Sequence, residues 1–245
     1  MQSFQRIALV TGANTGLGLH AAEQLAKRGV TVLLGARDPG RGQSAVDDFR
    51  RRSLPVELVV VDVTDETSIA DAVEVVQNRH GRLDVLINNA GISGGFAPTS
   101  SVTLEDLRRT YETNVFGVTA VTNAFLPLLR QSTAARIVNV SSGLGSEAVL
   151  GASSRFSKLN NAAYQSSKAA LNMLTYLYAN ELRNTGILVN AVSPGYRATA
   201  LNGGRPAPGA GDPAEGAEII VKAAMLPDDG PTGTFMADTG VDYSW

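Results

Sequence analysis

The chain has no cysteine, almost no net charge and no long apolar run. The lack of cysteine excludes disulfides, thiolate metal sites and a cysteine nucleophile, and we expect no metal site. With 21 basic and 23 acidic residues, the net charge of −2 offers no electrostatic footprint for nucleic acid or an anionic membrane. The first apolar run meets glycines long before the ~18 residues of a membrane span, and no basic leader precedes it. These absences favour a cytoplasmic protein that binds neither nucleic acid nor membrane.

Short apolar runs recur along the chain. Because they are apolar without alternation, they are typical of buried parallel strands. The runs cover residues 7–10, 31–34, 56–61, 83–87, 136–140 and 188–192. Stretches with helical spacing separate them, so strand and helix alternate throughout. This alternation predicts an α/β fold with a doubly wound parallel sheet of about seven strands and helices on both faces. The length of 245 residues favours one domain over residues 1–245.

Residue types mark several helix ends. Residues 64–80 have helical spacing, and Gly81 is a natural left-handed residue to end that helix. Thr103 begins a sequence that resembles a capping box. Asn161 is expected to open a long helix that ends at Gly186. Helices therefore fill the intervals between the predicted strands.

Low-complexity sequence is confined to residues 202–216, where glycine, proline and alanine dominate. That composition predicts a loop, and Asp212, Pro213 and Glu215 resemble the cap and first turn of a short helix. Two interpretations stay open, because the loop is either a plain connector or a lid over substrate. On the second interpretation, residues 196–224 form the substrate loop.

The first strand runs directly into a glycine-rich turn. The turn reads TGANTGLG over residues 11–18, and a helical pattern begins at about Leu19. Glycine lets the backbone bend tightly and lets a pyrophosphate approach main-chain N–H groups at the positive end of a helix. The Lys and Ser/Thr of a nucleoside-triphosphate loop do not follow the last glycine. The turn therefore predicts a dinucleotide site, with a purely structural turn as the alternative.

The spacing TGxxxGxG is the first of several ordered motifs. It is followed by NNAG at 88–91, Asn114, NVSS at 139–142, Tyr164, Lys168 and PG at 194–195. In this order the motifs resemble those of the short-chain dehydrogenase/reductase family, over essentially the whole chain. Within that family, GARDPGRG at 35–42 and GPTGTF at 230–235 are most similar to carbonyl reductases. The resemblance implies a single Rossmann domain with a nicotinamide cofactor.

The resemblance also implies which residues contact the cofactor. They are Gly12, Asn14, Thr15, Gly16, Leu17, Gly18, Asp62, Val63, Asn89, Ala90, Gly91, Tyr164, Lys168, Pro194, Gly195 and Thr199. Enzymes that prefer NAD usually carry an acidic residue about 20 residues past the glycines, where this chain has Arg37. A guanidinium there attracts a 2′-phosphate, and Arg41 one turn later adds to the attraction. NADP(H) is therefore the expected cofactor, unless both arginines are solvated surface charges.

Tyr164 and Lys168 lie four residues apart on a predicted helix, so they share one face. A nearby ammonium is expected to lower the pKa of a tyrosine from its ordinary value of about 10. By resemblance, Tyr164 is the general acid in reduction and the base in oxidation, while Lys168 holds the nicotinamide ribose. Ser142 donates to the substrate oxygen, and Asn114 anchors a water that connects Lys168 to solvent. Ser141 is then structural.

Three functions stay open. The leading one is an NADPH-dependent carbonyl reductase that acts on a small-molecule ketone or aldehyde. The alternatives are an NAD-dependent alcohol dehydrogenase of the same family and a nicotinamide-sensing protein without catalysis. Between Ser142 and Tyr164 the chain is longer than is usual in the family, and this insertion leaves the choice of monomer or homo-oligomer undecided.

Overall fold

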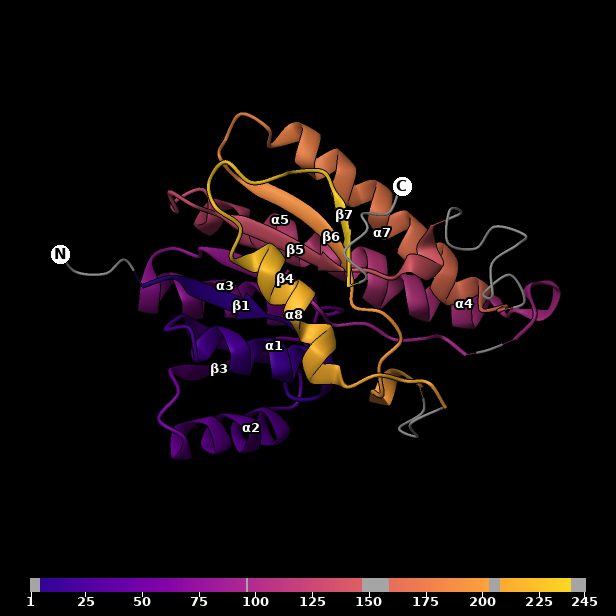
Figure 1. Cartoon of the computed structure of the whole chain (residues 1–245), viewed down its shortest axis with the longest axis horizontal. Coiled ribbons are helices and arrows are strands. Elements are labelled where there is room, and N and C mark those ends of the chain that lie inside the picture. Colours follow the sequence, from indigo (N-terminus) through magenta and orange to yellow (C-terminus); the bar gives the residue numbers. More distant parts are fainter. Residues whose placement is uncertain (1–4, 96, 147–158, 203–207, 239–245) are drawn as a thin grey trace.

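A computed structural model describes residues 5–95, 97–146, 159–202 and 208–238. Within them, seven strands form one parallel sheet in the order β3-β2-β1-β4-β5-β6-β7 (Figure 1). The strands are β1 (Ile7–Val10), β2 (Thr31–Ala36), β3 (Val56–Val60), β4 (Val85–Asn88), β5 (Arg136–Val140), β6 (Leu188–Ser193) and β7 (Phe235–Ala237). The first six fall on the six predicted apolar runs.

Helices connect the strands and cover both faces of the sheet. They are α1 (Gly16–Ala26), α2 (Pro39–Arg51), α3 (Glu66–His80), α4 (Leu104–Tyr111), α5 (Val118–Leu129), α7 (Ala162–Glu181) and α8 (Pro213–Ala224). Shorter helical segments are η1 (Thr99–Ser101), η2 (Glu112–Gly117), η3 (Gly143–Gly145) and η4 (Ala200–Asn202). Among these, η2 is a π-helix that joins α4 to α5.

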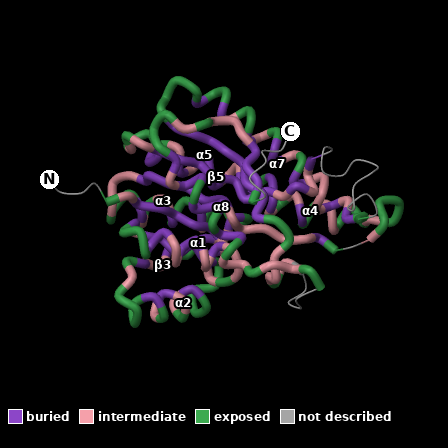
Figure 2. Tube along the Cα trace, in the orientation of Figure 1, coloured by how far each residue is buried: buried purple, intermediate pink, exposed green. Residues whose placement is uncertain are grey.

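Two apolar cores lie on opposite faces of the sheet. Because alternate strand residues point to opposite faces, Leu9 joins one core and Val10 the other. The core of Leu9 includes Phe125 and residues of α3, α5 and α7, whereas the core of Val10 includes Phe49 and residues of α1, α2 and α8. Figure 2 shows the strands buried between these helices. The protein is thus a doubly wound, Rossmann-like α/β domain, as the sequence predicted.

Local side chains begin and end the helices, and at Gly81, Thr103 and Asn161 they do so as the sequence predicted. Asp65 accepts hydrogen bonds from two backbone N–H groups in the first turn of α3, and Gly81 ends that helix with a φ of 70°. Thr103 accepts from a backbone N–H at the start of α4. Asn161 accepts from the N–H of Tyr164 at the start of α7, so the cap positions the tyrosine in the first helical turn.

Two predicted helix boundaries were wrong. Helix α1 begins at Gly16 rather than near Leu19, because the glycine turn itself forms the first helical turn and carries no apolar spacing. Helix α7 ends at Glu181 rather than at Gly186, because the backbone leaves the helix in tighter turns, one of which joins the Thr185 N–H to the Leu182 carbonyl. Both errors concern the ends of helices and leave the order of elements unchanged.

The predicted cap and first helical turn at Asp212, Pro213 and Glu215 are confirmed, because α8 begins at Pro213 behind an Asp212 cap. The helix is longer than the short one expected. Residues 203–207 lie outside the described residues, so neither the connector nor the lid interpretation is tested.

The chain order of the strands reverses between β1 and β4. These strands are neighbours in the sheet although β2 and β3 lie between them in the chain. In doubly wound sheets, ligands bind in the crevice at the carboxyl ends of the strands, where this reversal occurs. A ligand site is therefore expected at the residues that follow β1 and β4. In the described part of the chain, no helix is both long and apolar enough to cross a bilayer.

Candidate functional site

The glycine turn after β1 is tied to the residues that follow β4. The Thr11 hydroxyl accepts hydrogen bonds from the N–H groups of Asn89 and Ala90, at 3.0 and 3.1 Å. In return, the Asn89 amide donates to the carbonyls of Thr11 and Gly12, at 2.8 and 3.1 Å. The NNAG motif therefore fixes the shape of the glycine turn.

Only glycine fits the turn at two of its positions. A Cβ on Gly12, which has a φ of 61°, would lie 3.0 Å from Ala90 Cα, and a Cβ on Gly18 would collide with the Asn89 amide. No acidic side chain stands in the first turn of α1, and the Thr15 side chain does not cap it. The first N–H groups of α1 therefore stay available to an anion such as a diphosphate.

Ser142, Tyr164 and Lys168 meet at the carboxyl ends of β4 and β5. Ser142 follows β5, and the other two lie one turn apart on α7. The hydroxyls of Ser142 and Tyr164 are hydrogen-bonded to each other. The Lys168 ammonium donates to the Val140 carbonyl at 2.8 Å and lies 5.6 Å from the centroid of the Tyr164 ring. The structure thus brings together three of the four predicted catalytic residues, which we call the catalytic cluster.

Burial shifts the pKa values of the tyrosine and the lysine in opposite directions. Burial raises the pKa of Tyr164 to about 12, although the hydrogen bond with Ser142 lowers it in part. Burial lowers the pKa of Lys168 to about 8, because the low-dielectric surroundings disfavour its charge. The sequence predicted a lowered pKa for Tyr164, and that direction was wrong because desolvation by burial raises the pKa more than the hydrogen bond with Ser142 lowers it. Tyr164 is therefore a protonated phenol near neutral pH.

Asn114 lies in the π-helical segment η2 and is fully buried. Its amide donates to the Ile92 carbonyl at 2.9 Å and to the Ser167 hydroxyl at 3.0 Å, and its oxygen accepts from the Ile92 N–H. Both amide protons are therefore used to hold the segment after β4 against α7. π-Helical turns are frequent at functional sites. The predicted role of Asn114 in anchoring a water is not tested.

Two residues that the sequence analysis missed hold the segment around Ser142. The amide of Asn172 accepts from the Ser141 hydroxyl at 2.5 Å and donates to the Gly145 carbonyl at 3.3 Å. The Ser193 hydroxyl accepts from the Gly143 N–H at 3.0 Å. Asn172 is one turn beyond Lys168 on α7, so its helical spacing was the signal available. Ser141 is buried and bonded in this framework, as expected of a structural residue.

Other predicted cofactor residues line the same edge of the sheet. The chain returns to the glycine turn at Thr199, whose methyl would be 3.6 Å from a Cβ on Gly16. Asp62 follows β3, and one of its carboxylate oxygens accepts two hydrogen bonds from Thr64. Val63 is 9 % exposed and belongs to the apolar core that contains Leu9.

The remaining predicted cofactor residues follow strands β1, β4 and β6. Asn14, Leu17 and Gly18 lie in or beside the glycine turn, Ala90 and Gly91 follow β4, and Pro194 and Gly195 follow β6. A Cβ on Gly91 would lie 3.7 Å from the Lys168 ammonium, which places this glycine over the catalytic cluster. Their contacts with a cofactor stay predictions.

The predicted arginines Arg37 and Arg41 lie apart from the catalytic cluster, after β2 and in the first turn of α2. Both are exposed, and Arg37 forms no hydrogen bond or ion pair with any other described residue. Arg41 forms a loose ion pair with Asp38 at 3.8 Å. A hollow of about 500 Å³ beside α2 is lined by Arg41 together with Asn14 and Thr15 of the glycine turn.

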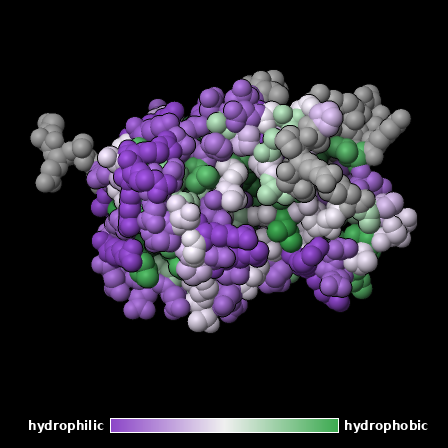
Figure 3. Space-filling model, turned by 90° about the horizontal axis from the view of Figure 1, so that it is seen from below, coloured by the Kyte–Doolittle hydropathy of each residue, from purple (hydrophilic) through white to green (hydrophobic). Residues whose placement is uncertain are grey.

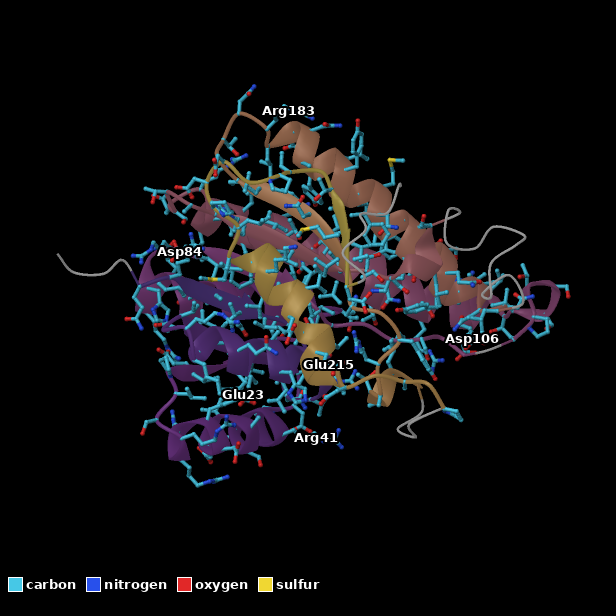
Figure 4. All side chains as sticks on the ribbon, in the orientation of Figure 1. Glu23, Arg41, Asp84, Asp106, Arg183 and Glu215 are labelled. Carbon is cyan, nitrogen blue, oxygen red and sulfur yellow. The ribbon has the colours of Figure 1, made fainter. Side chains whose placement is uncertain are left out.

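The surface near this hollow is polar. Figure 3 views the molecule from the side of α2 and shows a mainly hydrophilic face with hydrophobic residues in small groups. Figure 4 shows Arg41 on the same side as Glu215 at the start of α8, whereas Asp84 lies at the opposite ends of the strands. Arg41 is therefore placed to meet a polar group that extends from the glycine turn.

Comparison with known proteins gives a consistent result. A family model described as short chain dehydrogenase matches residues 6–208. Short-chain dehydrogenase anuI of Penicillium roqueforti is 40% identical over 89% of this chain and 88% of its own length. (−)-Isopiperitenone reductase of Mentha piperita is 32% identical over 96% of this chain and 97% of its own length.

Solved structures agree with the sequence comparisons. The NADPH-bound carbonyl reductase from chicken fatty liver superposes with a TM-score of 0.87 at 30% identity, covering 98% of this chain and 99% of that one. Salutaridine reductase from Papaver somniferum has a TM-score of 0.81 at 30% identity, covering 96% of this chain and 100% of that one. The likeness therefore extends over nearly all of each chain.

Proposed function

This chain belongs to the short-chain dehydrogenase/reductase family, and from that premise we propose that it is an NADPH-dependent reductase of small organic ketones or aldehydes. The observation that carries the proposal is the hydrogen bond between Tyr164 and Ser142 beside Lys168. Reduction of a carbonyl needs a proton donor and a second donor for the developing negative charge on oxygen. Two hydroxyls and a buried ammonium supply both. Relatives named as reductases support reduction, rather than alcohol oxidation, as the direction of the reaction.

The glycine turn fits the diphosphate of a dinucleotide. Gly12 and Gly18 leave no room for a Cβ, and the N–H groups at the start of α1 are free of an acidic neighbour. In our proposal these N–H groups hold the diphosphate, Arg37 and Arg41 hold the adenosine 2′-phosphate, and Lys168 holds the nicotinamide ribose. When bound, NADPH supplies the hydride that reduces the carbonyl carbon.

The protein's part in the reaction is to supply and stabilise a proton. In our proposal Tyr164 transfers its hydroxyl proton to the carbonyl oxygen, while Ser142 donates a hydrogen bond to the same oxygen. The Lys168 ammonium then stabilises the phenolate that is left behind. Because the raised pKa keeps Tyr164 protonated near neutral pH, the resting site is ready for reduction rather than for oxidation.

The proposal extends to the organisation of the chain. In our proposal residues 1–245 form one catalytic domain, and the substrate loop expected at 196–224 ends before α8, which occupies Pro213–Ala224. Asn114 completes the set by holding Ser167 of α7, one residue before Lys168. In our proposal it also anchors a water that connects Lys168 to solvent. Lys168 passes a proton to the phenolate of Tyr164 and regains one from solvent through this water.

The test is turnover of the Tyr164→Phe variant. NADPH absorbance is followed with quinones, aryl ketones, ketoesters and steroids, and NADPH binding is measured separately by fluorescence titration. We expect the variant to lose about 100- to 10,000-fold in kcat, which is the usual contribution of a general acid. NADPH binding should stay within about twofold, because the phenol oxygen is the only atom removed.

Tyr178→Phe is the matched control, because it removes a phenol oxygen from the same helix at a surface contact with Asn123. It should leave kcat unchanged. Near-normal turnover in Tyr164→Phe would defeat the assignment of the proton donor. Tight NADPH binding by the natural chain without turnover of any carbonyl would instead favour the sensor.

A further inference from the structure

Arg197 joins three segments that are distant in the sequence. Its Nε donates to the Pro194 carbonyl at 2.7 Å, Nη1 to the Glu215 carboxylate at 3.0 Å and Nη2 to the Asp238 carboxylate at 2.8 Å. The side chain is only 13 % exposed. It therefore connects the segment after β6 with the first turn of α8 and with the end of β7. We call Arg197, Glu215 and Asp238 the arginine clamp.

The surrounding backbone leaves space for the arginine clamp. A Cβ on Gly195 would collide with the Asp238 carboxylate, and a Cβ on Gly211 would collide with the Arg197 guanidinium. A Cβ on Gly216 would lie 2.7 Å from Arg197 Cγ. Three glycines from two segments thus lie where the clamp passes, so the guanidinium occupies a fitted site rather than open surface.

The clamp is connected to the glycine turn after β1. The Arg197 carbonyl accepts from the Thr199 N–H at 2.9 Å, and the Gly211 carbonyl accepts from the Ala198 N–H at 3.0 Å. These bonds fix the backbone at 197–199, and the Thr199 methyl then lies 3.6 Å from a Cβ on Gly16. Only two residues of hydrogen-bonded backbone therefore separate Arg197 from the contact between Thr199 and the glycine turn.

We propose that Arg197 is a positioning residue that holds Thr199 over the diphosphate site and so sets how tightly NADPH is retained. This inference rests on the function proposed above and adds a residue to its cofactor site. Two carboxylates neutralise the guanidinium, so it acts through Thr199 rather than as a direct ligand of the phosphates. It has no part in proton transfer.

The test compares Arg197→Ala with the natural chain. NADPH dissociation constants are measured by fluorescence titration without substrate, and KM and kcat are measured in turnover. We expect the variant to raise both the Kd and the KM for NADPH about tenfold, and to change kcat by less than about twofold. Arg197→Lys should give a smaller rise, because lysine keeps the charge but not the planar fork.

Arg183→Ala is the matched control, because it removes an exposed arginine whose side chain donates to Asn180 near the end of α7 (Figure 4). It should leave the Kd for NADPH unchanged. If Arg197→Ala does not fold, Asp238→Asn keeps the shape of the clamp while removing its charge partner, and the same rise in Kd is expected. An unchanged Kd in folded clamp variants overturns the proposal.

A double-mutant cycle separates positioning from general stability. Once Thr199→Ala has removed the positioned side chain, Arg197→Ala should raise the Kd for NADPH by less than about twofold further. Additive effects of the two changes would show that Arg197 acts on the site by another route, which contradicts the proposal. If the natural chain itself fails to bind NADPH, the proposed function fails, and the inference falls with it for that distinct reason.

Discussion

The catalytic cluster and the two arginines Arg37 and Arg41 lie on the same edge of the sheet but are held very differently. Lys168 is 5 % exposed and hydrogen-bonded to the backbone, and Ser142 is flanked by residues that Asn172 and Ser193 fix. Arg37, in contrast, is exposed and contacts no other described residue through a hydrogen bond or ion pair. One region is fixed before any ligand arrives, whereas the other is free to adapt to one.

The difference follows from what each region has to do. Groups that act on a reacting atom must be oriented beforehand, because a small misplacement costs much of the rate. Groups that recognise a phosphate at the surface need only charge and reach, and exposed charge interactions are individually weak. Substitutions in the catalytic cluster should therefore change kcat strongly, and substitutions of the arginines should change cofactor preference moderately.

Among the substitutions that test this difference, Ser142→Ala is expected to have the largest effect. Loss of the hydroxyl removes a donor to the developing negative charge and leaves Tyr164 without its hydrogen-bond partner. We expect kcat for carbonyl reduction to fall about 100- to 1,000-fold, as for loss of one oxyanion donor. The measurement is steady-state turnover at saturating NADPH, with thermal unfolding recorded in parallel.

Ser141→Ala is the neighbouring control. Its hydroxyl is buried and bonded to Asn172, so its loss should cost about 1–2 kcal/mol of unfolding free energy but only a small part of kcat. Equal losses of kcat in the two variants would mean that Ser142 supports the framework and does not touch substrate.

The pH dependence tests the same cluster with no substitution. The Lys168 ammonium must be charged to stabilise the phenolate of Tyr164, and burial lowers the pKa of that ammonium to about 8. Tyr164, with a pKa of about 12, stays protonated over the working range. We therefore expect kcat for reduction to be level below pH 8 and to fall about tenfold per pH unit above it.

Lys168→Arg is the control for this assignment. An arginine keeps its charge far above pH 8, so the fall in kcat should disappear even if the variant is slower overall. A fall at the same pH in the arginine variant would assign the titration to another group.

Much of the fold could be predicted because its signals are local. The strands are continuous apolar runs, Thr103 and Asn161 are capping residues, and Gly81 has the positive φ that its type favours. The glycine turn was also predictable, because its glycines follow a strand. A tight approach of two backbones requires glycine whatever the rest of the chain does.

The remainder depends on contacts between distant segments. Nothing near Arg197 in the sequence indicates that it would meet Asp238 or Glu215, and its charge alone is typical of an exposed residue. The pKa of Tyr164 was predicted in the wrong direction because the sequence showed the nearby ammonium but not the extent of burial. Burial is a property of the packed chain, so the spacing of two residues does not determine it.

The smallest expected effect concerns the exposed arginine after β2. Arg37→Asp replaces a group that attracts the 2′-phosphate with one that repels it and that accepts from a free 2′-hydroxyl. We expect kcat/KM for NADPH to fall roughly fivefold to tenfold, because an exposed charge contributes on the order of 1 kcal/mol. The value for NADH should rise or stay level, so the preference moves toward NADH. The measurement is kcat/KM for both cofactors at low and at high salt.

Arg183→Asp makes the same charge change just after the end of α7, on the far side of the molecule from α2 (Figure 4). It should leave the ratio of kcat/KM for NADPH to kcat/KM for NADH unchanged, because a distant exposed charge is screened within about 10 Å at 0.1 M salt. If Arg37→Asp leaves the ratio of the two efficiencies unchanged, Arg37 is a solvated surface charge. In that case Arg41, which lines the hollow beside the glycine turn, is the remaining candidate of the pair to hold the phosphate.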